Sequence, residues 1–78
     1  MKNENSEIGN KISKKIKLER NKRNLSQHTL SLMAGVDKNT IWKIETGRVS
    51  PTIITLEKIA KAFDMDFDSF MDLSKVEL

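Results

Sequence analysis

Hydrophobic residues recur along this chain with a helical period almost throughout. Ile8, Ile12 and Ile16 follow one another at four-residue intervals, the spacing that lines one face of an α-helix. This spacing predicts a first helix that ends near Arg23, with Asn24 in the left-handed conformation that closes many helices. Because strand-like alternation is absent, the chain is expected to be all-α.

The next apolar positions predict a short second helix over residues 27–33. Ser26 precedes this helix and can accept hydrogen bonds from the amides of its first turn. Leu30 and Met33 are expected to form its buried edge. Gly35 then breaks the pattern, so a turn should follow.

A third short helix is predicted after the turn. Asp37 is a good N-terminal cap, and Ile41 and Ile44 are spaced to share the buried face. Gly47 is placed to end this helix. Residues 48–51 are expected to form a loop that leads to the next helix.

Thr52 can cap a fourth helix, and Asp64 occupies that helix's C-terminal turn, where glycine would be more favourable. The expected apolar face of this helix consists of Ile53, Leu56, Ile59, Ala60 and Phe63. Asp66 is expected to cap a short fifth helix that carries Phe67 and Phe70 on one side. The whole pattern predicts a compact five-helix bundle with short connections.

The bundle is expected to be a single domain over residues 6–73. Residues 1–5 are expected to be a disordered lead, and residues 74–78 a C-terminal tail that frays or joins a dimer interface. The apolar stretches are too short to span a membrane, and the polar N-terminus lacks the apolar region of a signal peptide. A cytoplasmic protein is therefore expected.

Composition excludes several kinds of chemistry. The 78 residues contain no cysteine, so neither disulfides nor thiolate metal sites can form. His28 is the only imidazole and belongs to a predicted surface helix. No spacing suggests a nucleophilic triad or a phosphate-cradling loop. We therefore expect no enzymatic activity, no catalytic residue, no metal and no cofactor.

Charge is distributed unevenly, although the net charge is only +3. Between residues 11 and 23 a single acidic residue, Glu19, opposes a basic run. The basic residues are Lys11, Lys14, Lys15, Lys17, Arg20, Lys22 and Arg23. From Asp64 onward acidic residues predominate. The basic region suits a polyanionic partner, and the alternative is a solvated helix face.

The second and third predicted helices, joined by residues 34–37, have the dimensions of a DNA-binding helix-turn-helix. Gly35 permits a positive φ at the corner, and Val36 can fill the angle between the helices. The full pattern is Leu25-Ser26-Gln27, Leu30, Gly35-Val36, Ile41, Ile44-Glu45-x-Gly47-Arg48-x-x-Pro51, Leu56 and Ile59-Ala60-x-Ala62-Phe63.

From about Ile12 to Phe70 this pattern resembles the Cro and phage-repressor type (XRE) family of helix-turn-helix DNA-binding domains. The resemblance implies a lambda-repressor-like fold of five helices. Its second and third helices would dock on operator DNA, usually as a dimer on a palindrome.

The resemblance implies a recognition helix at about residues 38–46, in the major groove of double-stranded DNA. Its base-reading face would consist of Lys38, Asn39, Thr40, Trp42 and Lys43. Asparagine can pair with adenine, lysine can reach guanine or phosphate, and the threonine methyl can touch thymine. The alternatives are surface solvation for the lysines and helix capping for Asn39.

The resemblance also implies phosphate contacts for Gln27, at the start of the second helix, and Arg48, in the loop after the third. Such contacts fix register without reading sequence. The alternatives are capping for Gln27 and solvation for Arg48. Trp42 could stack on a sugar or touch a thymine methyl, or it could cover the seam beside the third helix; a mixed, half-buried role is expected.

The family commonly pairs an arginine of the first helix with a glutamate of the third, which here are Arg20 and Glu45. A partly buried, hydrogen-bonded ion pair with a structural role is therefore expected. Departures from the family pattern are Glu19 at an often apolar position, Asn24 and Asp64 in place of frequent glycines, and Ser31 in place of a frequent alanine.

A dimer would read twice as many base pairs as one recognition helix. The C-terminal part offers more apolar surface than one short helix needs. The candidates for a dimer interface are Ile54, Met65, Met71, Leu73 and Val76. Phe67 and Phe70 are expected to close the core instead.

The predicted function is a transcriptional regulator that binds a palindromic operator as a homodimer. The family includes phage repressors, Cro proteins, restriction-modification controllers and antitoxins, and the small size favours a controller or Cro protein. The alternative is an antitoxin or adaptor that uses this fold against a protein partner. RNA binding is disfavoured because aromatic stacking platforms are absent.

Overall fold

The computed structural model describes residues 6–77 as five α-helices without a strand. The expected disordered lead, residues 1–5, and the last residue of the tail lie outside the described residues. The helices are α1 (Glu7–Lys22), α2 (Gln27–Ala34), α3 (Lys38–Glu45), α4 (Ile53–Ala62) and α5 (Phe67–Phe70). The predicted all-α, five-helix fold is confirmed.

Four of the five helices begin with a side chain that caps the first turn. The caps are Ser6, Ser26, Asp37 and Thr52. Each side-chain oxygen accepts a hydrogen bond from a backbone amide two or three residues later, which satisfies a donor that the helix itself cannot. Asp66 precedes α5 but makes no such hydrogen bond, contrary to the prediction. A four-residue helix has only one turn to cap.

The C-terminal ends of α1 to α4 share one geometry. A residue in the left-handed conformation follows each helix: Asn24, Gly35, Gly47 and Asp64, with φ of 55°, 72°, 77° and 58°. The next amide then donates to a carbonyl five residues earlier, as when Arg48 N donates to Lys43 O at 2.8 Å. This is the Schellman arrangement, and it turns the chain sharply at every connection.

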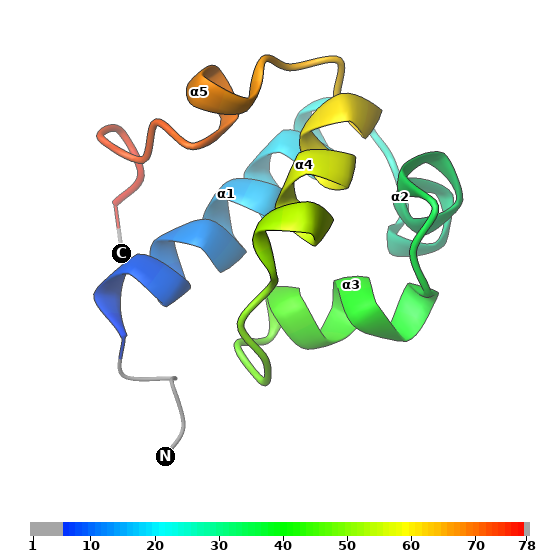
Figure 1. Ribbon diagram of the computed structural model, residues 1–78, viewed down its shortest axis with the longest axis horizontal. Helices are drawn as coiled ribbons and strands as arrows, with labels where there is room; N and C mark the ends of the chain where they lie inside the picture. Colours follow the sequence, from blue (N-terminus) through cyan, green and yellow to red (C-terminus); the bar gives the residue numbers. More distant parts are fainter. Residues whose placement is uncertain (1–5, 78) are drawn as a thin grey trace.

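The helices enclose one core. α2 packs against α3 and α4, α1 packs against α3, and α4 packs against α5 (Figure 1). The buried apolar residues are Ile16, Leu30, Ala34, Ile41, Ile44, Leu56, Ile59, Ala60, Phe63 and Phe70. Phe63 and Phe70 meet with ring centroids 6.0 Å apart, so α5 closes the end of the core.

Three apolar residues expected in the core are exposed instead: Ile8, Met33 and Ile53. On α2 the buried residues are Leu30, Ser31 and Ala34. At about 100° per residue, Met33 falls on the other side of Leu30 from this arc. Ile8 and Ile53 lie in the first turns of α1 and α4. The helical period assigns them to the correct face of each helix, but these first turns extend beyond the core.

The C-terminal tail packs onto α1, whereas the sequence left it either to fray or to join a dimer interface. Val76 is 6% exposed. Lys14 Nζ donates to the Glu77 carbonyl, and Lys15 Nζ donates to the Asp72 carbonyl at 3.5 Å. The tail runs back toward the start of α1 (Figure 1). The packed body therefore extends beyond residue 73, where the sequence placed the end of the domain.

Candidate DNA-binding surface

The third helix divides cleanly into a buried and an exposed side. Ile41 and Ile44 are fully buried, which turns the remaining positions outward. The exposed side, here called the α3 surface, consists of Lys38, Asn39, Thr40, Trp42 and Lys43. Thr40 is half-buried and the other four are exposed. The structure thus brings together all five residues that the sequence assigned to base reading.

The corner between α2 and α3 depends on Gly35. Its φ is 72°, a value that side-chain-bearing residues rarely adopt. A Cβ on Gly35 would meet nothing within 4 Å, so the requirement for glycine is one of backbone conformation rather than space. Val36 follows and packs against the core, where the sequence expected it. This corner holds α3 across the end of α2.

Asn39 and Gln27 are not helix caps, the alternative that their sequence positions left open. Asp37 caps α3, and its carboxylate accepts from the Asn39 backbone amide at 2.8 Å. Ser26 caps α2. The Asn39 side chain is exposed at the start of α3, where an amide has room to meet a base edge.

Arg20 and Glu45 form a bidentate ion pair between α1 and α3. Arg20 Nε lies 2.7 Å from Glu45 Oε2, and Arg20 Nη2 lies 2.9 Å from Glu45 Oε1. The remaining Arg20 nitrogen, Nη1, donates to the Leu25 carbonyl at 2.9 Å. The hydrogen bonds that Arg20 donates to Glu45 raise the pKa of Arg20, and burial opposes them less strongly. The pair anchors the C-terminal end of α3 to α1.

Gln27 belongs to the same network. Its Nε2 donates to Glu45 Oε1 at 3.1 Å, so the side chain is half-buried and points to α3 rather than freely into solvent. The sequence assigned Gln27 to phosphate contact and did not predict this bond. An amide at the start of α2 lies near a carboxylate at the end of α3 only once the corner has formed, and residue spacing alone does not report that.

Arg48 stacks on Trp42. Its guanidinium carbon lies 4.8 Å from the indole centroid, within the range of a cation–π contact. The Arg48 backbone amide donates to the Lys43 carbonyl. The family resemblance implies phosphate contacts by both the side chain and backbone amides here. Because the Arg48 amide already donates a hydrogen bond within the fold, only the side chain of Arg48 is available for such a contact. Trp42 itself is 42% exposed.

Ser13 adds a contact that sequence reasoning missed. Its hydroxyl donates to the Ile44 carbonyl at 2.6 Å and so ties α1 to the end of α3. The only signal in the sequence is that Ser13 lies one helical turn from Ile16 and Lys17 in a basic helix, which predicts no partner. This bond, together with the Arg20–Glu45 pair, fixes α3 against α1 at two points.

Glu19 is a second missed network. Its side chain is 7% exposed and lies 2.7 Å from Arg23 Nη1, 3.3 Å from Lys22 Nζ and 3.5 Å from Lys15 Nζ. Burial by itself would raise the pKa of Glu19, but the hydrogen bonds from Arg23 and Lys22 and the nearby positive charges outweigh it, and the pKa is lowered.

Arg23 extends the Glu19 network to α4. Its Nη2 donates to the Phe63 carbonyl at 3.0 Å, and its guanidinium carbon lies 4.8 Å from the Phe63 ring centroid. Glu19 therefore holds Arg23, which in turn contacts the end of α4.

Most basic side chains of the run on α1 pair with other groups of the same chain. Lys11 lies 3.7 Å from Glu7, three other basic side chains surround Glu19, and Lys14 is bonded to the tail. The sequence left open whether this run met a polyanion or solvent. Intramolecular pairing, which neither alternative included, accounts for most of these charges. The α3 surface is therefore the better candidate for a nucleic-acid contact.

The dimer-interface candidates differ in exposure. Val76 is covered by the monomer itself, contrary to the prediction, because the tail folds back onto α1. Three candidates are half-buried: Met65, Met71 and Leu73. Ile54 is 60% exposed beside Ile53, which is 66% exposed. Among the interface candidates, the most exposed side chain therefore lies at the start of α4 rather than in the tail.

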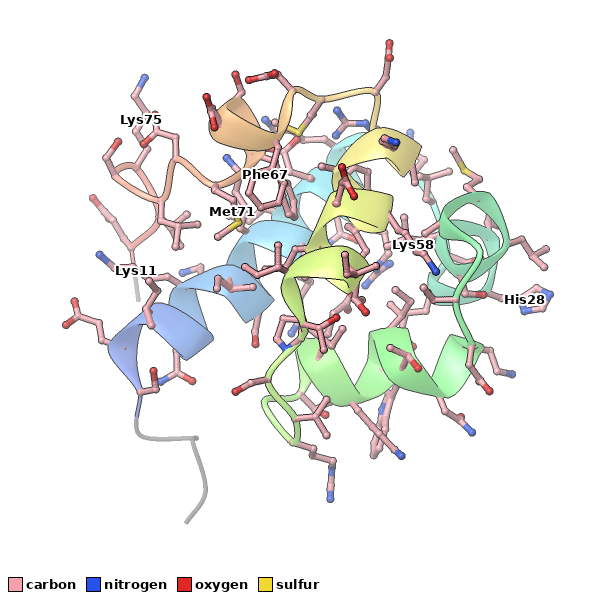
Figure 2. All side chains as sticks on the ribbon, in the orientation of Figure 1. Lys11, His28, Lys58, Phe67, Met71 and Lys75 are labelled. Atoms are coloured by element: carbon pink, nitrogen blue, oxygen red, sulfur yellow. The ribbon has the colours of Figure 1, made fainter. Side chains whose placement is uncertain are left out.

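Residues 6–77 contain no group of three or more histidine, cysteine or acidic side chains that could hold a metal ion. None of their helices is long and apolar enough to cross a membrane. His28 lies on the outer side of α2, away from the other helices (Figure 2).

This geometry defines a helix-turn-helix protein with the fold of DNA-binding transcriptional regulators. Residues 16–70 match the sequence family HTH_3, described as helix-turn-helix. Because the match covers most of the chain, the chain belongs to this family, and the resemblance read from the sequence is confirmed.

Solved structures agree with the family match. The restriction-modification controller protein C.AhdI from Aeromonas hydrophila is 24% identical, with a TM-score of 0.76 over 80% of this chain and 94% of its own. An HTH_3 family transcriptional regulator from Vibrio cholerae is 35% identical, with a TM-score of 0.79 over 86% of this chain and 39% of its own. No curated protein matches the chain significantly. Both structural relatives are regulators rather than enzymes.

Proposed function

We propose that this chain is a sequence-specific transcriptional regulator that binds double-stranded DNA as a homodimer, with α3 in the major groove. The observation that carries the proposal is the α3 surface. Its polar and basic side chains project from a helix that the Gly35 corner and the Arg20–Glu45 pair hold rigidly. An α-helix fits the major groove, where every base pair presents a distinct set of donors and acceptors.

Within the α3 surface, Asn39 is proposed to pair with adenine. Lys38 and Lys43 would reach guanine acceptors or phosphates, and the Thr40 methyl would touch thymine. Each of these side chains is at least partly accessible to solvent.

Gln27 and Arg48 are proposed to contact phosphates on either side of the groove. Gln27 can do so without leaving Glu45, because its amide nitrogen carries two hydrogens and only one is needed for Glu45 Oε1. Arg48 is exposed in the loop after α3. These contacts would set register, and the α3 surface would set sequence preference.

The homodimer is proposed because one short helix reads too few base pairs to find a single operator. The exposed pair Ile53 and Ile54 is the best surface for the second copy. Two recognition helices about 34 Å apart would then meet successive major grooves of a palindrome. Such a regulator would act in the cytoplasm, and the coverage of nearly all of C.AhdI favours a controller-type role.

A protein-interaction module, as in antitoxins and adaptors, is the second candidate. Leu32, on α2, is 69% exposed, and Met33 beside it is also exposed. Neither contributes to the core, so α2 has an apolar outer face that a protein partner could cover. In this case DNA binding would be secondary.

The test compares DNA affinity of the parent with that of the double variant Asn39→Ala, Lys43→Ala. Fluorescence anisotropy on a duplex selected for binding should show a loss of at least about tenfold, since one good base contact contributes roughly 1–3 kcal/mol. Lys75→Ala is the charge-matched control, because Lys75 lies at the α5 end of the molecule (Figure 2). Equal affinity of the double variant and the control would refute the proposal.

A further inference from the structure

Trp42 and Arg48 are joined more firmly than their exposure suggests. Trp42 is the only tryptophan of the chain. The Arg48 guanidinium carbon lies 4.8 Å from its ring centroid. The Trp42 carbonyl accepts hydrogen bonds from the Thr46 amide at 3.0 Å and from the Thr46 hydroxyl at 2.8 Å. These bonds fix the Trp42 backbone at the end of α3.

Arg48 is fixed at both ends of its side chain. Its backbone is held by the bond to the Lys43 carbonyl and by Gly47 in the left-handed conformation. Its guanidinium is held by the indole face. Without the ring, a long arginine side chain in an exposed loop would sample many rotamers.

The partners of Arg48 differ from those of the other arginines. Arg20 is paired with Glu45, and Arg23 is paired with Glu19. Within residues 6–77 no ion pair involves Arg48. A guanidinium stacked by its face keeps the N–H donors at its edge, and these donors match the geometry of a phosphate.

We propose that Trp42 is a positioning residue for Arg48 and not a base reader. Its ring holds the guanidinium at the rim of the α3 surface, oriented for a DNA phosphate. One face of the ring is occupied by Arg48, so that face cannot stack on a sugar. The inference rests on the DNA-binding function proposed above, and it revises the base-reading role that the sequence suggested for Trp42.

A double-variant cycle on a selected duplex tests the coupling. Trp42→Ala should weaken binding about two- to fivefold, the loss expected for a cation–π contact at an exposed site. In the Arg48→Ala background the same change should have no further effect. Trp42→Phe, which keeps an aromatic face, should retain most of the affinity. Duplex selection with Trp42→Ala should yield the parent's base preferences.

Additive losses in the cycle, or an altered base preference with Trp42→Ala, would overturn the proposal. Circular dichroism melts of all variants show whether the fold is retained. Variants that melt at the parent's temperature and lose DNA affinity non-additively support the proposal.

A second measurement needs no DNA. Because Trp42 is the only tryptophan, acrylamide quenching of its fluorescence reports how well Arg48 covers the ring. Quenching should increase with Arg48→Ala. It should stay unchanged with Lys43→Ala, the control that also removes one positive charge near Trp42. Unchanged quenching with Arg48→Ala would contradict the stack itself. If no duplex binds the parent at all, the proposed function fails, while the quenching result still decides the stack.

Discussion

Glu45 links α3 to two other helices through its side chain. It is 1% exposed and accepts hydrogen bonds from two residues, Arg20 and Gln27. A buried carboxylate is unfavourable unless its lone pairs are satisfied. Here the donors come from α1 and α2, so the carboxylate joins three helices at one point.

We predict that Glu45→Ala destabilises the fold by about 3–5 kcal/mol, because it leaves the Arg20 guanidinium buried and unpaired. This is a large part of the stability of so small a domain. A thermal melt measures the loss. Glu45→Gln keeps the shape of the side chain and some of its hydrogen bonds, so its stability should lie between that of the parent and that of Glu45→Ala. An alanine variant as stable as the parent would contradict the structural role.

Glu19 makes stability depend on pH. Its pKa is lowered in the folded chain, so its charged form stabilises the fold above its usual value of 4.5. That contribution is lost as pH falls below 4.5 through the lowered pKa. Glu19→Gln should therefore be less stable than the parent at neutral pH, and the difference should shrink as the pH falls below 4.5 through the lowered pKa.

Urea unfolding at a series of pH values measures the Glu19 effect. Glu57→Gln, which changes an exposed carboxylate on α4, controls for the general loss of one negative charge. A constant difference between Glu19→Gln and the parent at every pH would show that the buried ion pairs do not act as described.

At the scale of the element, four helices use the same C-terminal geometry with different residues. Gly35 and Gly47 adopt positive φ without cost from a side chain, whereas Asn24 and Asp64 adopt it with one. Asp64 has a second disadvantage, since a negative charge at a helix C-terminus opposes the helix dipole. Local stability was therefore not maximised at the end of α4.

We predict that Asp64→Gly stabilises the chain by up to about 1 kcal/mol, or several degrees in Tm. Gly35→Ala is the reverse experiment. Its Cβ would meet nothing, so its cost should be purely conformational, about 1 kcal/mol or more. Scanning calorimetry measures both. A lower Tm for Asp64→Gly would mean that the carboxylate has a compensating role.

Helix boundaries and caps were predictable from the sequence because both are local. Ser26, Asp37 and Thr52 cap the helices that follow them, and Asn24 and Gly35 end the helices before them. Which residues are buried was less predictable. Ile8 and Ile53 have the correct helical period, but the period does not report where along its axis a helix leaves the core.

At the scale of the whole molecule, the sequence predicted which residues form the candidate site. It did not predict which other side chains those residues contact. The α3 surface follows from burial of Ile41 and Ile44. The bonds from Gln27 to Glu45 and from Arg48 to Trp42 arise from side chains that meet only after folding. The bonds from Lys14 and Lys15 to the tail, and the burial of Val76, likewise form only when the tail folds back onto α1.

The proposed homodimer concerns the whole molecule, and we predict that Ile54→Asp abolishes dimerisation. An aspartate in the first turn of α4 suits the helix dipole, so the fold should persist. Sedimentation at micromolar concentration should show a dimeric parent and a monomeric variant. Leu32→Asp, at an equally exposed apolar position on α2, should remain dimeric. A monomeric parent would exclude the homodimer.

Selection of bound duplexes from a random library, followed by a salt titration of the enriched sequence, tests the central claim most directly. We expect a palindromic consensus with half-sites about one helical turn apart, and an affinity that falls steeply as salt rises because each phosphate contact releases counterions. Enrichment no better than the starting library, or an affinity insensitive to salt, would contradict a DNA-reading function.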